Sequence, residues 1–155
     1  MKFGTVNHQG KAALVVKQGE DVVLLAPLYA KAGLGAAPDS MNTLIEGGPD
    51  LLAGIRQAVA DAPARGAALL ETGTLDWLPP QPRPSKVLGV AFNNMGIRKS
   101  AHFDPGVPNF FLKAPSCLTG HGKPVVIHEH YGETIPELEL AVIIGKRCSA
   151  IPPQD

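Results

Sequence analysis

Alternating apolar and polar side chains predict strands in the first 26 residues. Residues 2–8, 12–17 and 21–26 each combine aliphatic or β-branched positions with polar neighbours. The short connections between them contain Gly10 and Gly19, and glycine readily adopts the positive φ that tight turns require. The pattern therefore predicts a small antiparallel meander of three strands.

Helical spacing follows the meander. A short helix is predicted over residues 41–46, where Asp39 or Ser40 can accept hydrogen bonds from its first turn. A longer helix begins at Pro49, because proline lacks an N–H group that the first helical turn would leave unpaired, and it stops before Pro63. Its apolar positions share one face, which we expect to pack on the meander: Leu51, Leu52, Ile55 and Val59.

A proline-rich stretch, residues 79–84, divides the chain into two parts. Closely spaced prolines favour a stiff, extended connector, so we predict an N-terminal αβ subdomain over 1–78 and a second domain over 85–155. Further strands are predicted over 85–92, 109–113 and 124–128.

The strongest strand pattern lies over residues 135–145, with proline near its start and glycine at its end. The run over 141–144 is apolar throughout, which is typical of a strand buried on both faces. Such a strand needs neighbours and few candidates precede it, so we expect the chain to be the front part of a longer fold. On a strand, Glu137 and Glu139 point to the same side about 7 Å apart. Two adjacent carboxylates repel each other, and a hard divalent cation between them would relieve that repulsion.

Composition excludes several classes of function. Basic and acidic residues are equal in number, 14 each, and no run of Lys or Arg indicates a nucleic-acid or membrane surface. The N-terminus lacks the apolar core of a signal peptide. Cys117 and Cys148 are too few for a disulfide framework, which favours reduced thiols in a cytoplasmic protein.

A second metal site competes with the glutamate pair. His128 and His130 would share a face if the strand over 124–128 continued, although no third ligand converges on them. Neither cysteine has a paired base, so a nucleophilic-cysteine enzyme is not expected.

Three segments, taken in order, resemble the fumarylacetoacetate hydrolase family: residues 84–90, 110–120 and 136–147. The resemblance implies an α+β, mainly β fold, in which the small N-terminal subdomain is followed by the first part of a mixed β-roll or sandwich domain. It also implies a homodimer and a site for Mg²⁺, or for Mn²⁺ or Ca²⁺. Glu137 and Glu139 match two of the metal ligands, and the third, an Asp, would lie beyond Asp155.

The same resemblance implies an enzyme that acts on a small oxo-acid or 1,3-diketo acid by C–C bond hydrolysis, decarboxylation or isomerisation. Lys113 would bind a carboxylate or stabilise an oxyanion, and residues 93–105 would form a lid. Phe92 and Asn93 would contact substrate with Lys113. Hydrolases of the family carry a histidine base close to the position of Met95, and methionine cannot take a proton. Either His102 replaces that base or the reaction is an isomerisation or decarboxylation.

A different class of function also accounts for Met95. The chain would then be a catalytically inert protein of the same fold that acts as an assembly or binding module. An aspartate after residue 155 would favour the enzyme.

Overall fold

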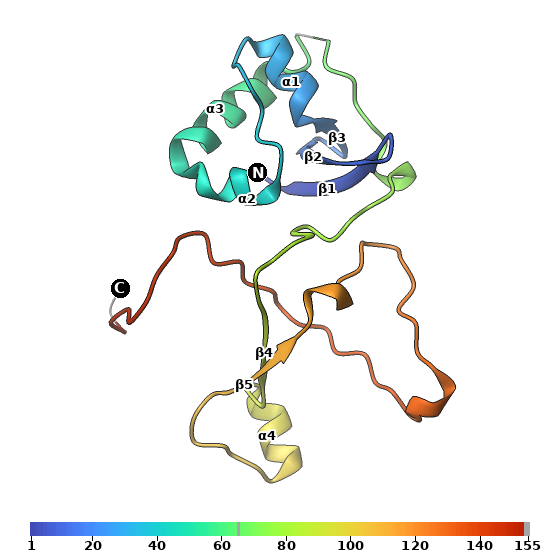
Figure 1. The fold of residues 1–155 in the computed structure, drawn as a ribbon, viewed down its shortest axis with the longest axis vertical. Coiled ribbons are helices and arrows are strands. Elements are labelled where there is room, and N and C mark those ends of the chain that lie inside the picture. The colour runs from blue at the N-terminus through green and yellow to red at the C-terminus, as the bar shows by residue number, and fades with distance from the viewer. Residues whose placement is uncertain (65, 154–155) are drawn as a thin grey trace. The chain divides into compact units, whose positions relative to one another are not determined.

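A computed structural model describes residues 1–64 and 66–153 (Figure 1). Helices and strands occur together and the strands form two small antiparallel sheets, which confirms the α+β class. The chain divides into two compact units, Met1–Pro80 with Thr119–Asp155 (unit 1) and Gln81–Leu118 (unit 2).

The sheet of unit 1 is the predicted meander. Strands β1 (Phe3–His8), β2 (Lys11–Gln18) and β3 (Asp21–Leu24) pair antiparallel in the order β1-β2-β3. The prediction that the third strand reaches residue 26 is wrong, because helix α1 (Leu25–Ala32) begins directly after β3. This helix has no side-chain cap at its start, and Gly33 ends it at a φ of 69°.

Both predicted helices are confirmed, as α2 (Met41–Glu46) and α3 (Gly48–Asp61). At the start of α2, the Thr43 amide donates to Ser40 Oγ over 3.2 Å and Thr43 Oγ1 donates to Asp39 Oδ1 over 2.8 Å. The first bond satisfies one of the backbone N–H groups that a helix start leaves unpaired. With α3 at 14 residues, no helix in the described ranges is both long and apolar enough to cross a bilayer.

The meander buries apolar side chains on both faces, as the alternation of side chains along a strand requires. On one face, Leu14, Val16 and Val23 pack against the three helices, and Ile55 of α3 is fully buried there. This confirms the predicted contact between the second helix and the meander. On the other face, a second cluster is covered by residues that follow α3: Val6, Val15 and Val22 packed with Leu70, Leu75 and Trp77.

Unit 2 is a two-stranded antiparallel sheet with one helix. Strand β4 (Val87–Ala91) pairs with β5 (Asn109–Lys113), both where strands were predicted, and α4 (Met95–Ala101) lies in the connection. Gly89 lies opposite Phe111, and a β-carbon on Gly89 would stand 2.2 Å from the Phe111 ring. Glycine at this position therefore gives the ring room to lie over the strand.

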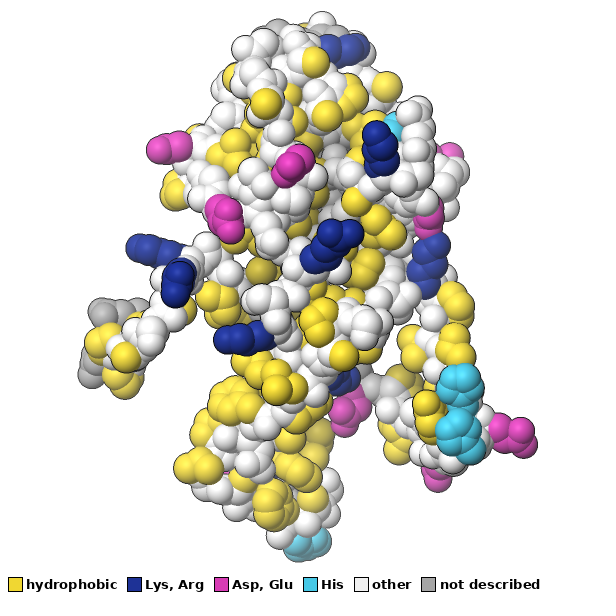
Figure 2. All heavy atoms as spheres, viewed as in Figure 1, with side chains coloured by type: hydrophobic (Ala, Val, Ile, Leu, Met, Phe, Trp, Pro, Cys, Tyr) yellow, Lys and Arg dark blue, Asp and Glu magenta, His cyan; other side chains and the backbone are white. Residues whose placement is uncertain are grey.

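Two predicted strands do not form. Residues 124–128 and 135–145 have no regular structure, and the 3₁₀ turn η3 (Glu129–Tyr131) lies between them. No backbone of another described segment pairs with either, so their N–H and C=O groups lack the ladder that defines a strand. The expectation that residues 141–144 are buried is also wrong, since Val142 is 76% exposed. Figure 2 shows many hydrophobic side chains at the surface of the molecule.

Candidate metal and ligand sites

The glutamate pair lies in the extended segment after η3. Glu137 and Glu139 are both exposed and are separated by Leu138, which is also fully exposed. Carboxylate oxygens are the ligands that Mg²⁺, Mn²⁺ and Ca²⁺ prefer, so the donor chemistry of the pair fits such an ion. In the described part of the chain no group of three His, Cys, Asp or Glu side chains gathers into a metal site. That Glu137 and Glu139 are two ligands of a metal ion therefore stays a prediction.

The other predicted site residues belong to unit 2. Lys113 is exposed at the end of β5, opposite Val87, with its Nζ 5.8 Å from the centre of the Phe111 ring. His102 ends α4 in the left-handed conformation, with a φ of 50°. Phe92 follows β4 at a φ of 56°, and Asn93 is exposed beside it. Their roles as substrate and catalytic residues remain predictions.

The stretch predicted as a lid is partly ordered by local contacts. Asn94 caps α4, accepting from the Gly96 amide at 2.8 Å and the Ile97 amide at 3.4 Å. Arg98 donates to the carbonyl of Phe92 and forms a 3.2 Å ion pair with Asp104. Sequence reasoning missed these contacts, which fix the backbone around Phe92 without using the side chain of Asn93.

The side chains of His128 and His130 lie close together, but no third metal-ligating side chain joins them among the described residues. The rings of His128 and His130 are stacked with their centres 5.6 Å apart, and the ring of Tyr131 stands edge-on to both. Neither histidine belongs to a cluster of three metal-ligating side chains within the described residues. Cys117 and Cys148 are free and exposed, in line with the expectation of unpaired thiols.

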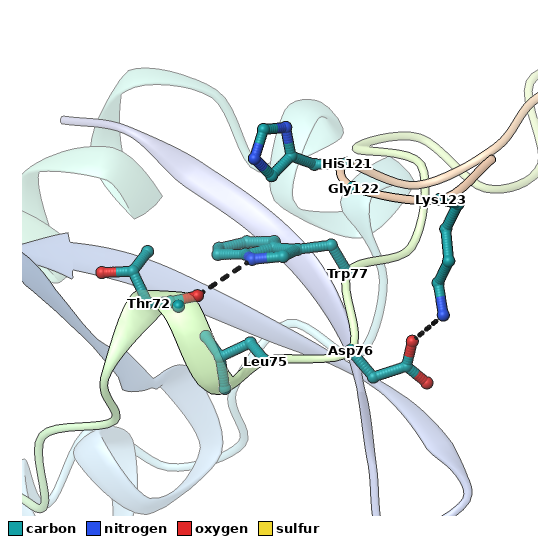
Figure 3. A pocket seen from close by; sticks show the side chains of 8 residues that line it. Thr72, Leu75, Asp76, Trp77, His121, Gly122 and Lys123 are labelled. Carbon is teal, nitrogen blue, oxygen red and sulfur yellow. Dashed lines mark hydrogen bonds and ion pairs between the residues drawn. The ribbon is translucent and has the colours of Figure 1, made fainter. Parts of the chain in front are cut away.

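Unit 1 contains a hollow of about 600 Å³ that sequence reasoning did not find (Figure 3). Its walls come from the segment around the 3₁₀ turn η1 (Thr72–Thr74) and from the turn at residues 121–123. We call it the Trp77 pocket, lined by Thr72, Gly73, Leu75, Asp76, Trp77, His121, Gly122 and Lys123.

Polar contacts fix the walls of the Trp77 pocket. The indole N–H of Trp77 donates to the Thr72 carbonyl at 3.2 Å, and Lys123 forms an ion pair with Asp76. The carboxylate of Asp76 also accepts a hydrogen bond from the side-chain amide of Asn7 at 2.9 Å. The bond from Lys123, and then that from Asn7, lower the pKa of the Asp76 carboxyl because both stabilise its charged form.

Residues 88–155 match the domain described as Fumarylacetoacetate (FAA) hydrolase C-terminal. These residues belong to the fumarylacetoacetate hydrolase family. The match begins within β4 and includes Lys113, Glu137 and Glu139, which lie in two of the three segments that carry the resemblance.

Curated relatives of this family member include proteins named as tautomerases. Oxaloacetate tautomerase YisK of Bacillus subtilis is 37% identical over 81 residues, which cover 49% of this chain and 27% of the relative. Mitochondrial oxaloacetate tautomerase FAHD2A of Homo sapiens is 31% identical over 119 residues, 76% of this chain and 37% of the relative. An uncharacterised protein of Pyrococcus horikoshii is 37% identical over 71 residues, 45% of this chain and 31% of the relative. The chain thus spans about a third of the length of the relatives it matches.

Proposed function

We propose that this family member takes part in a divalent-metal-dependent enzyme that isomerises a small oxo-acid of the oxaloacetate class. The observation that carries the proposal is the match over residues 88–155 to a family in which several relatives are named oxaloacetate tautomerases. Met95 supports isomerisation or decarboxylation over hydrolysis, because it lies close to where the family's hydrolases place their histidine base and methionine cannot accept a proton.

Keto–enol interconversion requires only the transfer of protons. A proton leaves the carbon next to the ketone and a proton joins the ketone oxygen, so the atoms balance without water. A divalent ion held by Glu137 and Glu139 would supply Lewis acidity toward the ketone oxygen. Lys113 is an exposed ammonium and would bind a carboxylate of the acid, which orients its carbon chain. His102 is the proposed group for moving the proton.

Metal binding is tested directly by calorimetric titration of the 155-residue chain with Mg²⁺ and Mn²⁺. Glu137→Gln and Glu139→Gln each remove one charged ligand and should weaken binding about tenfold or more, in line with the effect of losing a charge-assisted contact. Glu133→Gln is the matched control, since it removes an exposed carboxylate from the same segment. Equal metal affinity in all four proteins would overturn the metal site.

Activity is tested by following the ultraviolet absorbance of enolic oxaloacetate. The proposal expects the chain with Mg²⁺ to speed its decay to the keto form, and Lys113→Met to raise KM more than it lowers kcat. A panel of acylpyruvates tests C–C hydrolysis in parallel. Cleavage of an acylpyruvate without tautomerisation of oxaloacetate would replace the isomerase proposal by the hydrolase.

The inert binding module is the second candidate, and Met95 favours it because methionine cannot serve as the base. It predicts no turnover of either substrate and no effect of Glu137→Gln on metal affinity. The predicted homodimer and the cytoplasmic location belong to the proposal as well. Light scattering on the eluting protein tests the dimer, and fractionation of the source cells tests the location.

A further inference from the structure

The Trp77 pocket combines one aromatic face with a small set of polar groups, none of which belongs to the predicted metal site. Trp77 packs its indole against the backbone of Gly4, where a β-carbon would stand 2.5 Å from the ring. Its N–H bond to Thr72 fixes the plane of the indole. In Figure 3 the imidazole of His121 lies across the hollow from the indole.

The polar side chains of the pocket differ in how many of their hydrogen bonds are already made within the protein. Both carboxylate oxygens of Asp76 already accept a hydrogen bond, one from Asn7 and one from Lys123. The hydroxyl of Thr72 donates to the carbonyl of Glu20 at 2.5 Å. An ammonium group carries three N–H donors, so Lys123 keeps two after its bond to Asp76. These remaining donors favour an acceptor group on a ligand near Lys123.

We propose that the Trp77 pocket binds a small planar aromatic carboxylate. The ring would stack on the face of Trp77, and the carboxylate would accept hydrogen bonds from Lys123 with His121 beside it. A cation fits less well, because Asp76 is the one carboxylate among the lining residues and its charge is already paired with Lys123.

The chain reports on this pocket by itself, since Trp77 is its single tryptophan. Benzoate is titrated into the 155-residue chain in metal-free buffer while tryptophan fluorescence is recorded. We expect a saturable change with a Kd of roughly millimolar, the range of a few favourable contacts. Cyclohexanecarboxylate has the same charge without a flat ring and should bind more weakly, as should benzylamine, which has the ring with the opposite charge.

Two pocket variants should shift affinity in opposite directions. Lys123→Gln removes the main donor and should weaken benzoate binding about tenfold, the value of one charge-assisted hydrogen bond. Asp76→Asn removes the neighbouring negative charge and frees Lys123, so benzoate should bind more tightly. Lys11→Gln is the control, because it removes an exposed lysine that does not line the pocket.

Circular dichroism confirms that each variant is folded before its titration is interpreted. A response to benzoate that never saturates, benzylamine binding as tightly as benzoate, or unchanged affinity in Lys123→Gln would each overturn the proposal. The metal-free buffer keeps this result separate from the proposed enzyme, whose test requires Mg²⁺ or Mn²⁺ and the pair Glu137 and Glu139.

Discussion

Gly120 holds the turn at residues 121–123 against the N-terminal part of unit 1, and replacing it by alanine should release that turn. Gly120 is buried. A β-carbon there would stand 1.8 Å from the carbonyl oxygen of Trp77, 2.6 Å from its carbonyl carbon and 3.1 Å from the Cα of Leu78. All three neighbours are backbone atoms, so no side-chain rotation can relieve the overlap.

The backbone at Trp77 cannot easily move away. On one side the backbone N–H of Asn7 donates to the backbone carbonyl of Asp76 at 2.8 Å. On the other side the backbone N–H of Leu78 donates to the carbonyl of Thr5 at 2.9 Å. These bonds tie the segment to β1. In Gly120→Ala the turn itself must therefore withdraw by more than 1 Å, from 1.8 Å to at least the 3.0 Å below which real Cβ contacts essentially never fall.

Overpacking of this kind costs about 1–3 kcal/mol, which would shift the equilibrium toward an undocked turn by roughly 5- to 150-fold. The Trp77 pocket loses the wall that contains His121 and Lys123. The core of Leu14, Val16 and Ile55 lies on the other face of the sheet, so the far-ultraviolet circular dichroism should change little.

Acrylamide quenching of the single tryptophan measures the release. In Gly120→Ala, acrylamide should quench the fluorescence of Trp77 more steeply than in the wild type, and the emission should shift to longer wavelength. Gly73→Ala is the matched control: it adds the same methyl group to another wall of the pocket, where nothing lies within 4 Å and φ is not positive. Equal quenching in the two variants, both folded, would refute the docking of residues 121–123 described above.

Two further predictions concern unit 1. Ile55→Ala should lower the free energy of unfolding by about 2–5 kcal/mol, because the side chain is fully buried among the helices and the sheet, and a denaturant titration should show a lower midpoint at an unchanged slope. For Asp76, whose pKa is lowered from its ordinary 3.8 in the folded chain, the stability gained from the charged carboxylate should be fully present above that value and lost as the pH falls through the folded pKa. Asp76→Asn should lack this part of the acid dependence when melting temperatures are compared between neutral and strongly acidic pH, and an identical acid profile in both proteins would contradict it.

The local parts of the fold could be predicted from the sequence. Turn glycines and alternation locate β1 to β3, and Ser40 and Pro49 mark the starts of α2 and α3. Helix α1 was missed because its first residues continue the apolar run of β3 and no side chain caps it. Local signals therefore sufficed for these strands and for the two helices whose starts Ser40 and Pro49 mark.

Non-local pairing could not be predicted. Residues 135–145 have a strand-like pattern, yet strand formation depends on a partner backbone, and the described residues offer none. The Trp77 pocket joins residues that are 44 positions apart or more, Trp77 and the turn at 121–123, and no spacing in the sequence indicates that they meet. The glutamate pair was found because both side chains lie two residues apart on one extended segment.

The exposure of the segment after Glu139 has a consequence for how the protein behaves in solution. Residues 140–145 carry no charge and no proline, and Leu140 is 92% exposed. Short uncharged windows of this kind can stack between copies as cross-β assemblies. Glu139 and Lys146 bound the window as charged gatekeepers. We therefore expect a carboxylate proposed to hold a metal ion also to oppose aggregation, and Glu139→Gln should bind thioflavin T sooner than Glu133→Gln at equal concentration.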